Sequence, residues 1–181
     1  VQELSLPSLA RHLIAAHRRG VQVKLVLENS YSTPWSDQQP SHLPKHQRHR
    51  WHQLQHLADA DGDGITTAEE ARQGDAVGLL LQAGVPLLDD TEDGSSGSGL
   101  MHHKFVVIDN KTVITGSFNW SPSAAHTNDE TLLVIHSPQL AKHFTREMDR
   151  LWNGAELGIT PHIQRKLDRQ KIRCGDGVER G

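Results

Sequence analysis

Residues 101–119 carry the side chains with the clearest chemical potential in this chain. His102 supplies an imidazole, which is a nucleophile when neutral, and Lys104 supplies an ammonium group that attracts phosphate oxygens. Ser117 and Asn119 follow within a stretch of eighteen residues and add a hydroxyl and an amide. One nucleophile, one cation and two hydrogen-bonding groups are a set suited to chemistry at phosphorus.

Two short strands are needed to bring these groups together. The apolar run at 105–108 predicts a strand, and alternation along it places His102 and Lys104 on one face. The run at 112–115 predicts a second strand, after which Gly116 allows the backbone to turn. We therefore expect the serine and asparagine that follow to approach the surface that carries the histidine and lysine.

The spacing of the stretch is specific: His-x-Lys, four residues, Asp109, six residues and Gly-Ser-x-Asn. It resembles the signature of the phospholipase D superfamily, and the resemblance extends over most of the chain. A lone His-x-Lys would be read more simply as an exposed pair at the start of a strand, but the second group at a fixed distance favours the family. The resemblance implies an α/β fold with a mixed β-sheet flanked by helices.

The chemistry follows from the substrate that this family attacks. A phosphodiester resists nucleophiles because its negative oxygens repel them, so catalysis needs cations and donors on those oxygens and an uncharged nucleophile. The resemblance implies that His102 attacks phosphorus to form a phosphohistidine, while Lys104, Ser117 and Asn119 hold the non-bridging oxygens. We expect no metal ion or other cofactor in this chemistry.

Two carboxylates complete the site that the resemblance implies. Glu130 stands where the family has a carboxylate that bonds the other nitrogen of the catalytic histidine and fixes its tautomer. Asp109 is expected to support the strand pair and the site geometry without taking a direct part.

The acid that protonates the leaving oxygen is, in this family, the histidine of a second copy of the motif, and the sequence holds one copy. Two explanations stay open. Either a homodimer brings His102 of each chain to a shared site, or a preceding half with the other motif has been cut away. Val1 stands first in place of Met, which suggests a trimmed or processed product. A likeness to small single-motif, Nuc-type endonucleases favours the homodimer.

Several substrates remain compatible with this chemistry. The preferred hypothesis is an endonuclease acting on DNA or RNA. The alternatives are a phospholipase D that converts phosphatidylcholine-type lipids to phosphatidic acid, and an inactive module that binds nucleic acid or calcium. A net charge of −3 argues against coating nucleic acid through bulk charge, but leaves a local basic site open. No amphipathic helix with exposed aromatic residues is evident, which counts against lipid.

The domain organisation has three parts. We predict a catalytic domain at 1–28 and 76–158, an insertion at 29–75 and a basic tail at 159–181, which could contact phosphates or be a solvated helix. A helix capped by Ser5 should open the chain, followed by a strand that ends near residue 27. Further predicted elements are helices at 67–83 and 138–152 and strands at 85–88 and 131–135.

The insertion is rich in histidine. A helix predicted at 46–57 would align His49, His52 and His56 on one face. Three such residues could hold zinc or contact a polyanion, but a solvated, histidine-rich helix is favoured.

An acidic loop follows this helix and resembles an EF-hand calcium loop. Asp59, Asp61 and Asp63 occupy positions one, three and five, with glycine at six and Glu70 at twelve. The apolar residue expected at position eight stands at seven, and aligning on it makes Glu69 the closing ligand instead. The alternative to a structural calcium ion is an acidic turn that caps the next helix without any metal.

Composition indicates one modest globular domain. A chain of 181 residues with 35% hydrophobic residues can bury a core. The single cysteine, Cys174, excludes an internal disulfide framework, so redox usage does not identify the compartment. A periplasmic or secreted location is favoured over a cytoplasmic one, and no apolar run is long enough to span a bilayer.

Overall fold

The computed structural model describes residues 1–90 and 100–154. Both helices and strands occur in these ranges, which confirms the expected α/β class, whereas the predicted tail lies outside them. The elements in chain order are α1 (Pro7–Arg18), β1 (Leu25–Glu28), η1 (Asn29–Tyr31), η2 (Trp35–Asp37), η3 (Pro40–His42), α2 (Lys45–Ala58), α3 (Ala68–Gly74), α4 (Ala76–Gln82), β2 (Leu87–Asp90), β3 (Phe105–Ile108), β4 (Thr112–Gly116), α5 (Pro122–His126), β5 (Leu132–His136) and α6 (Pro138–Gly154).

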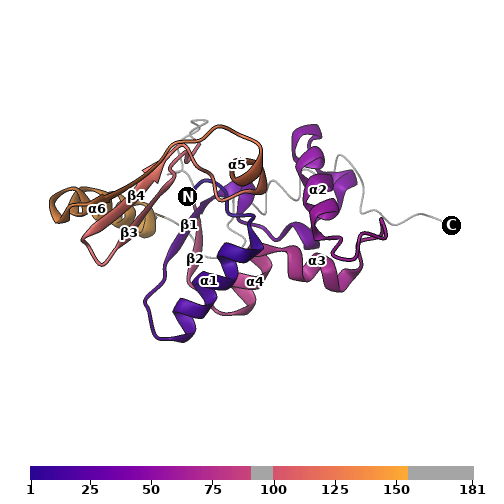
Figure 1. Cartoon of the computed structure of the whole chain (residues 1–181), viewed down its shortest axis with the longest axis horizontal. Coiled ribbons are helices and arrows are strands. Elements are labelled where there is room, and N and C mark those ends of the chain that lie inside the picture. Colours follow the sequence, from indigo (N-terminus) through magenta and orange to yellow (C-terminus); the bar gives the residue numbers. More distant parts are fainter. Residues whose placement is uncertain (91–99, 155–181) are drawn as a thin grey trace.

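Two sheets, connected by the first residues of the chain, form the β-structure (Figure 1). β1 and β2 pair in parallel, whereas β3, β4 and β5 form an antiparallel sheet. The Gln2 N–H donates to the His103 carbonyl over 2.7 Å, and the Gln2 carbonyl accepts from the Glu28 N–H over 3.2 Å. Leu4 adds an isolated parallel bridge to Trp120. The N-terminal segment therefore joins the parallel and antiparallel pairs into one mixed arrangement.

Helices α1 and α4 lie side by side against the parallel pair (Figure 1). Ala10 and Ile14 of α1 share a buried apolar cluster with Leu27 of β1 and Leu80 of α4. Burial of these side chains is the main force that holds the helices on the sheet.

The prediction that Ser5 caps the first helix is wrong. Leu6 is the N-cap residue, and its side chain makes no capping bond. The backbone N–H groups of Ser5 and Leu6 both donate to the Trp120 carbonyl, so Ser5 belongs to the strand-like segment before the helix. The helix begins at Pro7, whose fixed φ suits a first turn.

Helix α6 covers one face of the antiparallel sheet. The ring of Phe144 on α6 meets Phe105 of β3 edge to face, with centroids 5.0 Å apart, and Val113 of β4 is fully buried. The Ser137 hydroxyl accepts from the Leu140 N–H over 3.2 Å, so a serine caps this helix as the sequence indicates.

The single helix predicted at 67–83 is instead two helices, α3 and α4, which meet at Asp75. Asp75 is 1% exposed and has an extended backbone, with φ −93° and ψ 97°. Its carboxylate accepts from the Gly78 N–H, which caps α4, and from the backbone and hydroxyl of Ser36 at 2.9 and 2.7 Å. These hydrogen bonds favour an N-cap over a continuous helix.

Helices α2 and α3 form a small unit at the end of the molecule away from the β3–β4 hairpin (Figure 1). Trp35, Leu54 and Ala58 make its buried cluster. Arg50 of α2 connects this unit to the N-terminal segment, because its Nε lies 2.9 Å from the Glu3 carboxylate. The boundaries of the catalytic domain and the insertion stay a prediction.

Candidate active site

His102 and Lys104 lie in the segment that leads into β3. The Lys104 ammonium group donates to the His102 carbonyl over 3.1 Å, which folds the lysine side chain back along its own motif. The His102 side chain is exposed, and within the described residues no hydrogen bond holds its imidazole. The ring is therefore accessible from solvent.

Gly116 sets the position of the second half of the motif. Its φ is 150°, and a Cβ atom there would lie 1.9 Å from the Thr131 carbonyl oxygen. Because a glycine lets the two backbones approach, the Ser117 N–H donates to that carbonyl over 2.9 Å, and the Thr131 N–H donates to the Ser117 hydroxyl over 2.9 Å. Two hydrogen bonds thus fix Ser117 beside the start of β5.

Gln2 joins the two halves of the motif. Its side-chain oxygen accepts from the Lys104 ammonium group over 2.7 Å and from the Asn119 amide over 3.4 Å. Gln2 is only 7% exposed, so this oxygen is a fixed point on which the cation and the amide meet.

Sequence reasoning missed Gln2 because it lies 102 positions before Lys104 and 117 before Asn119. The available signal was the polar side chain of Gln2 in the short segment before the first helix, where the family resemblance expects a strand.

Burial and nearby carboxylates act in opposite directions on Lys104. Burial lowers the pKa of its ammonium group, while the charges of Glu130 and Glu3 raise it. The pKa of Glu130 is lowered mainly by hydrogen bonds from Ser117 and Asn128, and further by the charge of Lys104. The charges of Lys104 and Glu130 thus each favour the charged form of the other group.

The expected bond between Glu130 and His102 is not formed in the described part of the chain. The Glu130 carboxylate accepts instead from the Ser117 hydroxyl and the Asn128 amide. The close approach of the two backbones at Gly116 and Thr131 brings Glu130 to the Ser117 hydroxyl, and a role in fixing the His102 tautomer stays a prediction.

His103 faces away from Lys104, as strand alternation requires. Its Nε2 lies 3.0 Å from the Glu147 carboxylate on α6, and Glu147 also pairs with Arg150 at 2.8 Å. Arg150 is the main cause of the lowered pKa of Glu147, and His103 adds to it. His103, the residue after His102, is thereby held to the covering helix α6.

Asp109 lies at the tip of the β3–β4 hairpin and not with the other predicted site residues. Asp109 and Asn110 both have φ 52°, and the Lys111 N–H donates to the Ile108 carbonyl over 3.0 Å. Positive φ at both central residues is typical of a type I′ turn, which aspartate and asparagine tolerate. Asp109 therefore shapes the hairpin.

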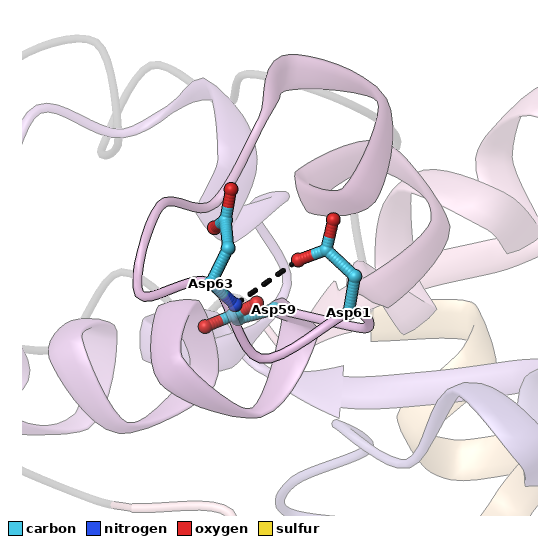
Figure 2. Close-up of side chains that lie close together, drawn as sticks. All are labelled: Asp59, Asp61 and Asp63. Carbon is cyan, nitrogen blue, oxygen red and sulfur yellow. Dashed lines mark hydrogen bonds between the residues drawn. The ribbon is translucent and has the colours of Figure 1, made fainter.

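The acidic loop gathers Asp59, Asp61 and Asp63 on one turn (Figure 2). One carboxylate oxygen from each lies within 4.8 Å of the others, close enough to share one cation. Within the loop, Asp59 accepts from the N–H groups of Gly62 and Gly64, at 2.8 and 2.9 Å. The loop is thus closed by its own backbone donors.

The two glutamates proposed as closing ligands lie outside this group. Glu70 and Thr67 form a capping box at the start of α3, and Glu70 also accepts from the Ala60 N–H over 3.0 Å. Glu69 pairs with Arg72 at 2.8 Å. The next helix is thus capped by Thr67 together with Glu70, and not by the three aspartates of the turn.

The histidine-rich helix is present as α2, and His49, His52 and His56 are all exposed on it. Among the described residues, the only group with metal-ligand geometry is the three aspartates of the acidic loop. The histidines therefore make no preformed zinc cluster in that part of the chain.

Fold and site together define an α/β protein in which Lys104 and Asn119, which flank the β3–β4 pair, meet at the Gln2 side-chain oxygen, while His102 is exposed two residues before the lysine. Residues 2–152 match the family described as "Cardiolipin synthase, PLD-like domain". The chain therefore belongs to the phospholipase D superfamily. Members of this superfamily hydrolyse phosphodiester bonds and generally need no metal ion for catalysis.

Relatives and solved structures agree with this assignment. The chain is 31% identical to the mitochondrial cardiolipin hydrolase of Xenopus tropicalis over 148 residues, which are 82% of this chain and 50% of that protein. It is 27% identical to the human mitochondrial cardiolipin hydrolase, covering 82% of this chain and 42% of that protein. The chain thus spans about half the length of the curated relatives it matches.

Two solved structures have the same fold. Nuc from Salmonella typhimurium, a phospholipase D family member, superposes with a TM-score of 0.54 at 24% identity, covering 86% of this chain and 76% of that one. NucT from Helicobacter pylori gives a TM-score of 0.55 at 17% identity, covering 86% and 77%. None of the helices in the described residues is long and apolar enough to cross a bilayer.

Proposed function

We propose that this chain is a phosphodiesterase that acts through a phosphohistidine, and that its preferred activity is endonucleolytic cleavage of DNA or RNA. The observation that supports this most strongly is the meeting of Asn119 with Lys104, which lies two residues after His102, at the Gln2 side-chain oxygen. This arrangement supports the proposal because a phosphate attached to His102 would need a cation and an amide donor for its oxygens.

Two displacements at phosphorus make up the reaction. First, the neutral His102 nitrogen bonds to phosphorus, the bond to the leaving ester oxygen breaks, and a second, protonated imidazole gives that oxygen its proton. Water then attacks phosphorus, the second imidazole takes a proton from it, and the phosphorus–nitrogen bond breaks. Lys104, Ser117 and Asn119 stabilise the charge on the non-bridging oxygens in both steps.

Nucleic acid is the preferred substrate because the compact, single-motif chain is similar to Nuc-type endonucleases in its motif. A phospholipid is the second candidate, and the specific observation in its favour is 31% identity to a protein named mitochondrial cardiolipin hydrolase. The same displacement chemistry serves both. A third candidate is an inactive binding module, which the complete set of motif side chains argues against.

A side-by-side assay separates the three candidates. Purified protein is incubated with a labelled oligonucleotide and with vesicles that contain phosphatidylcholine or cardiolipin, and His102→Ala serves as the control. Cleavage of one substrate that disappears in the variant identifies the activity. Absence of cleavage of every substrate by the folded wild-type protein would contradict the proposal and favour the binding module.

We further propose that a second copy of the chain completes the site. The sequence contains one His-x-Lys motif, and the reaction needs a second imidazole. Ile108, Leu132 and Val134 are 44, 53 and 56% exposed, and strand register places them on the sheet face opposite α6. Alternation along β3 continues this face toward Lys104, so a homodimer packed there brings two His102 side chains together.

A mixing experiment tests whether the site is shared. Wild-type chains are co-refolded with increasing fractions of His102→Ala chains, and activity is measured for each mixture. If both histidines are needed, activity falls as the square of the wild-type fraction. A linear fall would show that each chain works alone and would overturn the shared site.

We also infer that the acidic loop holds a structural calcium ion. The support is the convergence of three aspartate oxygens, because Ca²⁺ prefers several oxygen ligands. Glu70 would have to give up its capping bonds to join them, so the loop closes with Asp59, Asp61 and Asp63 and with water. The ion lies in the insertion and takes no part in the displacement steps.

A further inference from the structure

Gln2 holds both phosphate-directed groups of the motif on a single atom. The Lys104 ammonium group and the Asn119 amide donate to the same side-chain oxygen, at 2.7 and 3.4 Å. The backbone of Gln2 is itself fixed, because its N–H donates to the His103 carbonyl over 2.7 Å and its carbonyl accepts from the Glu28 N–H over 3.2 Å. The side chain therefore starts from a rigid point between the two sheets.

We propose that Gln2 is a positioning residue, which sets the spacing and orientation of Lys104 and Asn119 for the transferred phosphate. The inference rests on the phosphodiesterase function proposed above. Gln2 acts through its two partners and makes no contact with the substrate itself.

Lys104 and Asn119 keep N–H donors that are not used on Gln2 and that remain for the substrate. A lysine ammonium group has three N–H donors, and the structure uses two of them, on Gln2 and on the His102 carbonyl. The Asn119 amide has two N–H donors and spends one on Gln2. Each group therefore retains one donor that no hydrogen bond within the described residues uses, and in the proposed role these two donors bind oxygens of the phosphate.

The neutral amide is also the right chemical type for this role. A carboxylate at the same place would form an ion pair with Lys104 and cancel part of the charge needed by the phosphate. An apolar side chain would leave the ammonium group half-buried without its acceptor and able to rotate away. Glu3, the next residue, does not replace Gln2, because its carboxylate is paired with Arg50 at 2.9 Å.

Two substitutions test the proposal. Gln2→Met keeps the length of the side chain and removes the acceptor, whereas Gln2→Glu keeps the shape and adds a negative charge. The matched controls are Gln82→Met and Gln82→Glu at the exposed end of α4. Each variant is compared with wild type for thermal unfolding, for kcat and KM separately, and for the pH profile of kcat/KM.

The Gln2→Met variant should lose kcat by roughly tenfold to a hundredfold, because a misplacement of about 1 Å costs on the order of a hundredfold. In the Gln2→Glu variant the added carboxylate should raise the pKa of Lys104, so the alkaline limb of the profile should move to higher pH. If Gln2 had a merely structural role, its substitution would change thermal unfolding but leave kcat per folded molecule and the pH profile unchanged. That result in either folded variant would overturn the proposal.

Failure of the proposed function gives a different result. In that case wild type cleaves no phosphodiester, and the positioning role is then tested by NMR titration of labelled lysine side chains, with Lys104 assigned by Lys104→Arg. Gln2→Glu should move the Lys104 titration to higher pH. A titration identical to that of wild type would overturn the inference independently of activity.

Discussion

Gly116 is the residue at which backbone geometry and the site depend most directly on each other. Its φ of 150° disfavours any side chain, and a Cβ atom would lie 1.9 Å from the Thr131 oxygen and 2.8 Å from the Thr131 carbonyl carbon. Backbone atoms cannot yield as a flexible side chain can, so the strands must separate. Ser117 would then lose its two hydrogen bonds with Thr131.

We predict that Gly116→Ala lowers the free energy of unfolding by about 1–3 kcal/mol or more and reduces kcat at least tenfold. Urea denaturation and steady-state kinetics measure the two effects. Gly20→Ala is the control, because φ there is also positive, at 89°, but no atom lies within 4 Å of the added Cβ. Equal losses in both variants would mean that φ alone, and not the contact with Thr131, accounts for the effect.

Lys104 should determine the alkaline side of the pH dependence. Its ammonium group must keep its proton to hold a phosphate, and burial lowers its pKa. A lowered pKa means that the proton is lost at a lower pH than in an ordinary lysine, whose pKa is about 10.4. We therefore expect kcat/KM to fall on the alkaline side before that value is reached.

The control for this pH effect is Lys104→Arg, since a guanidinium group keeps its charge across the whole range. Its activity will be lower because the fork-shaped group fits the lysine site poorly, but its alkaline limb should disappear. An unchanged limb in the arginine variant would assign the titration to another group.

At the scale of single residues, the motif spacing singled out His102, Lys104, Ser117 and Asn119, and the structure brings Lys104 and Asn119 together on Gln2, while the catalytic roles of all four stay predictions. Sequence reasoning could not find Gln2, because its contact with Lys104 spans 102 positions and depends on how the N-terminal segment lies between the two sheets. The partner of Glu130 was likewise not predictable, since it depends on the close approach of two backbones at Gly116.

Among the elements, strands and helices with a strong apolar pattern were predicted well, while breaks caused by one buried polar group were not. The helix predicted at 67–83 divides at Asp75 because that carboxylate has partners on η2 as well as on α4. Helix α5, with Pro122 in its first turn and Ser121 as its cap, was overlooked, although Ser-Pro is a helix-start signal. Tertiary hydrogen bonds explain the break at Asp75, and the short length of α5 explains why this helix was overlooked.

The acidic loop is the element whose ligand can be tested separately from catalysis. We expect millimolar Ca²⁺ to raise Tm, because an ion that binds the folded loop stabilises the folded state. Turnover should persist in chelator, since the displacement steps use only side chains. Differential scanning calorimetry and the cleavage assay, each with and without chelator, measure these effects.

The double variant Asp61→Asn with Asp63→Asn removes two of the three gathered carboxylates and should abolish the calcium-dependent shift in Tm. The same Tm with calcium and with chelator in wild type would contradict the structural ion. Loss of turnover in chelator by a protein that stays folded, with recovery on adding metal, would contradict metal-free catalysis.

On the scale of the whole molecule, the insertion and the hairpin extend from the central strands in different directions (Figure 1). The insertion contacts the N-terminal segment through Arg50 and Glu3, one residue from Gln2. The face of the antiparallel sheet that points away from α6 carries half-exposed apolar side chains along β5. In the homodimer proposed above, this surface faces the second chain.

Val134 lies on this apolar face, opposite Ile114 in the strand register, and is 56% exposed. We predict that Val134→Lys leaves the fold intact, because the added ammonium group remains in water in the monomer, but disrupts a homodimer that buries this position. The variant should sediment as a monomer and lose nearly all turnover, because one chain supplies one imidazole where two are needed. Ile65→Lys in the insertion is the control, since Ile65 is 67% exposed and lies off the sheet. An active monomer, or a Val134→Lys variant that stays dimeric and fully active, would show that this face is not where two copies meet.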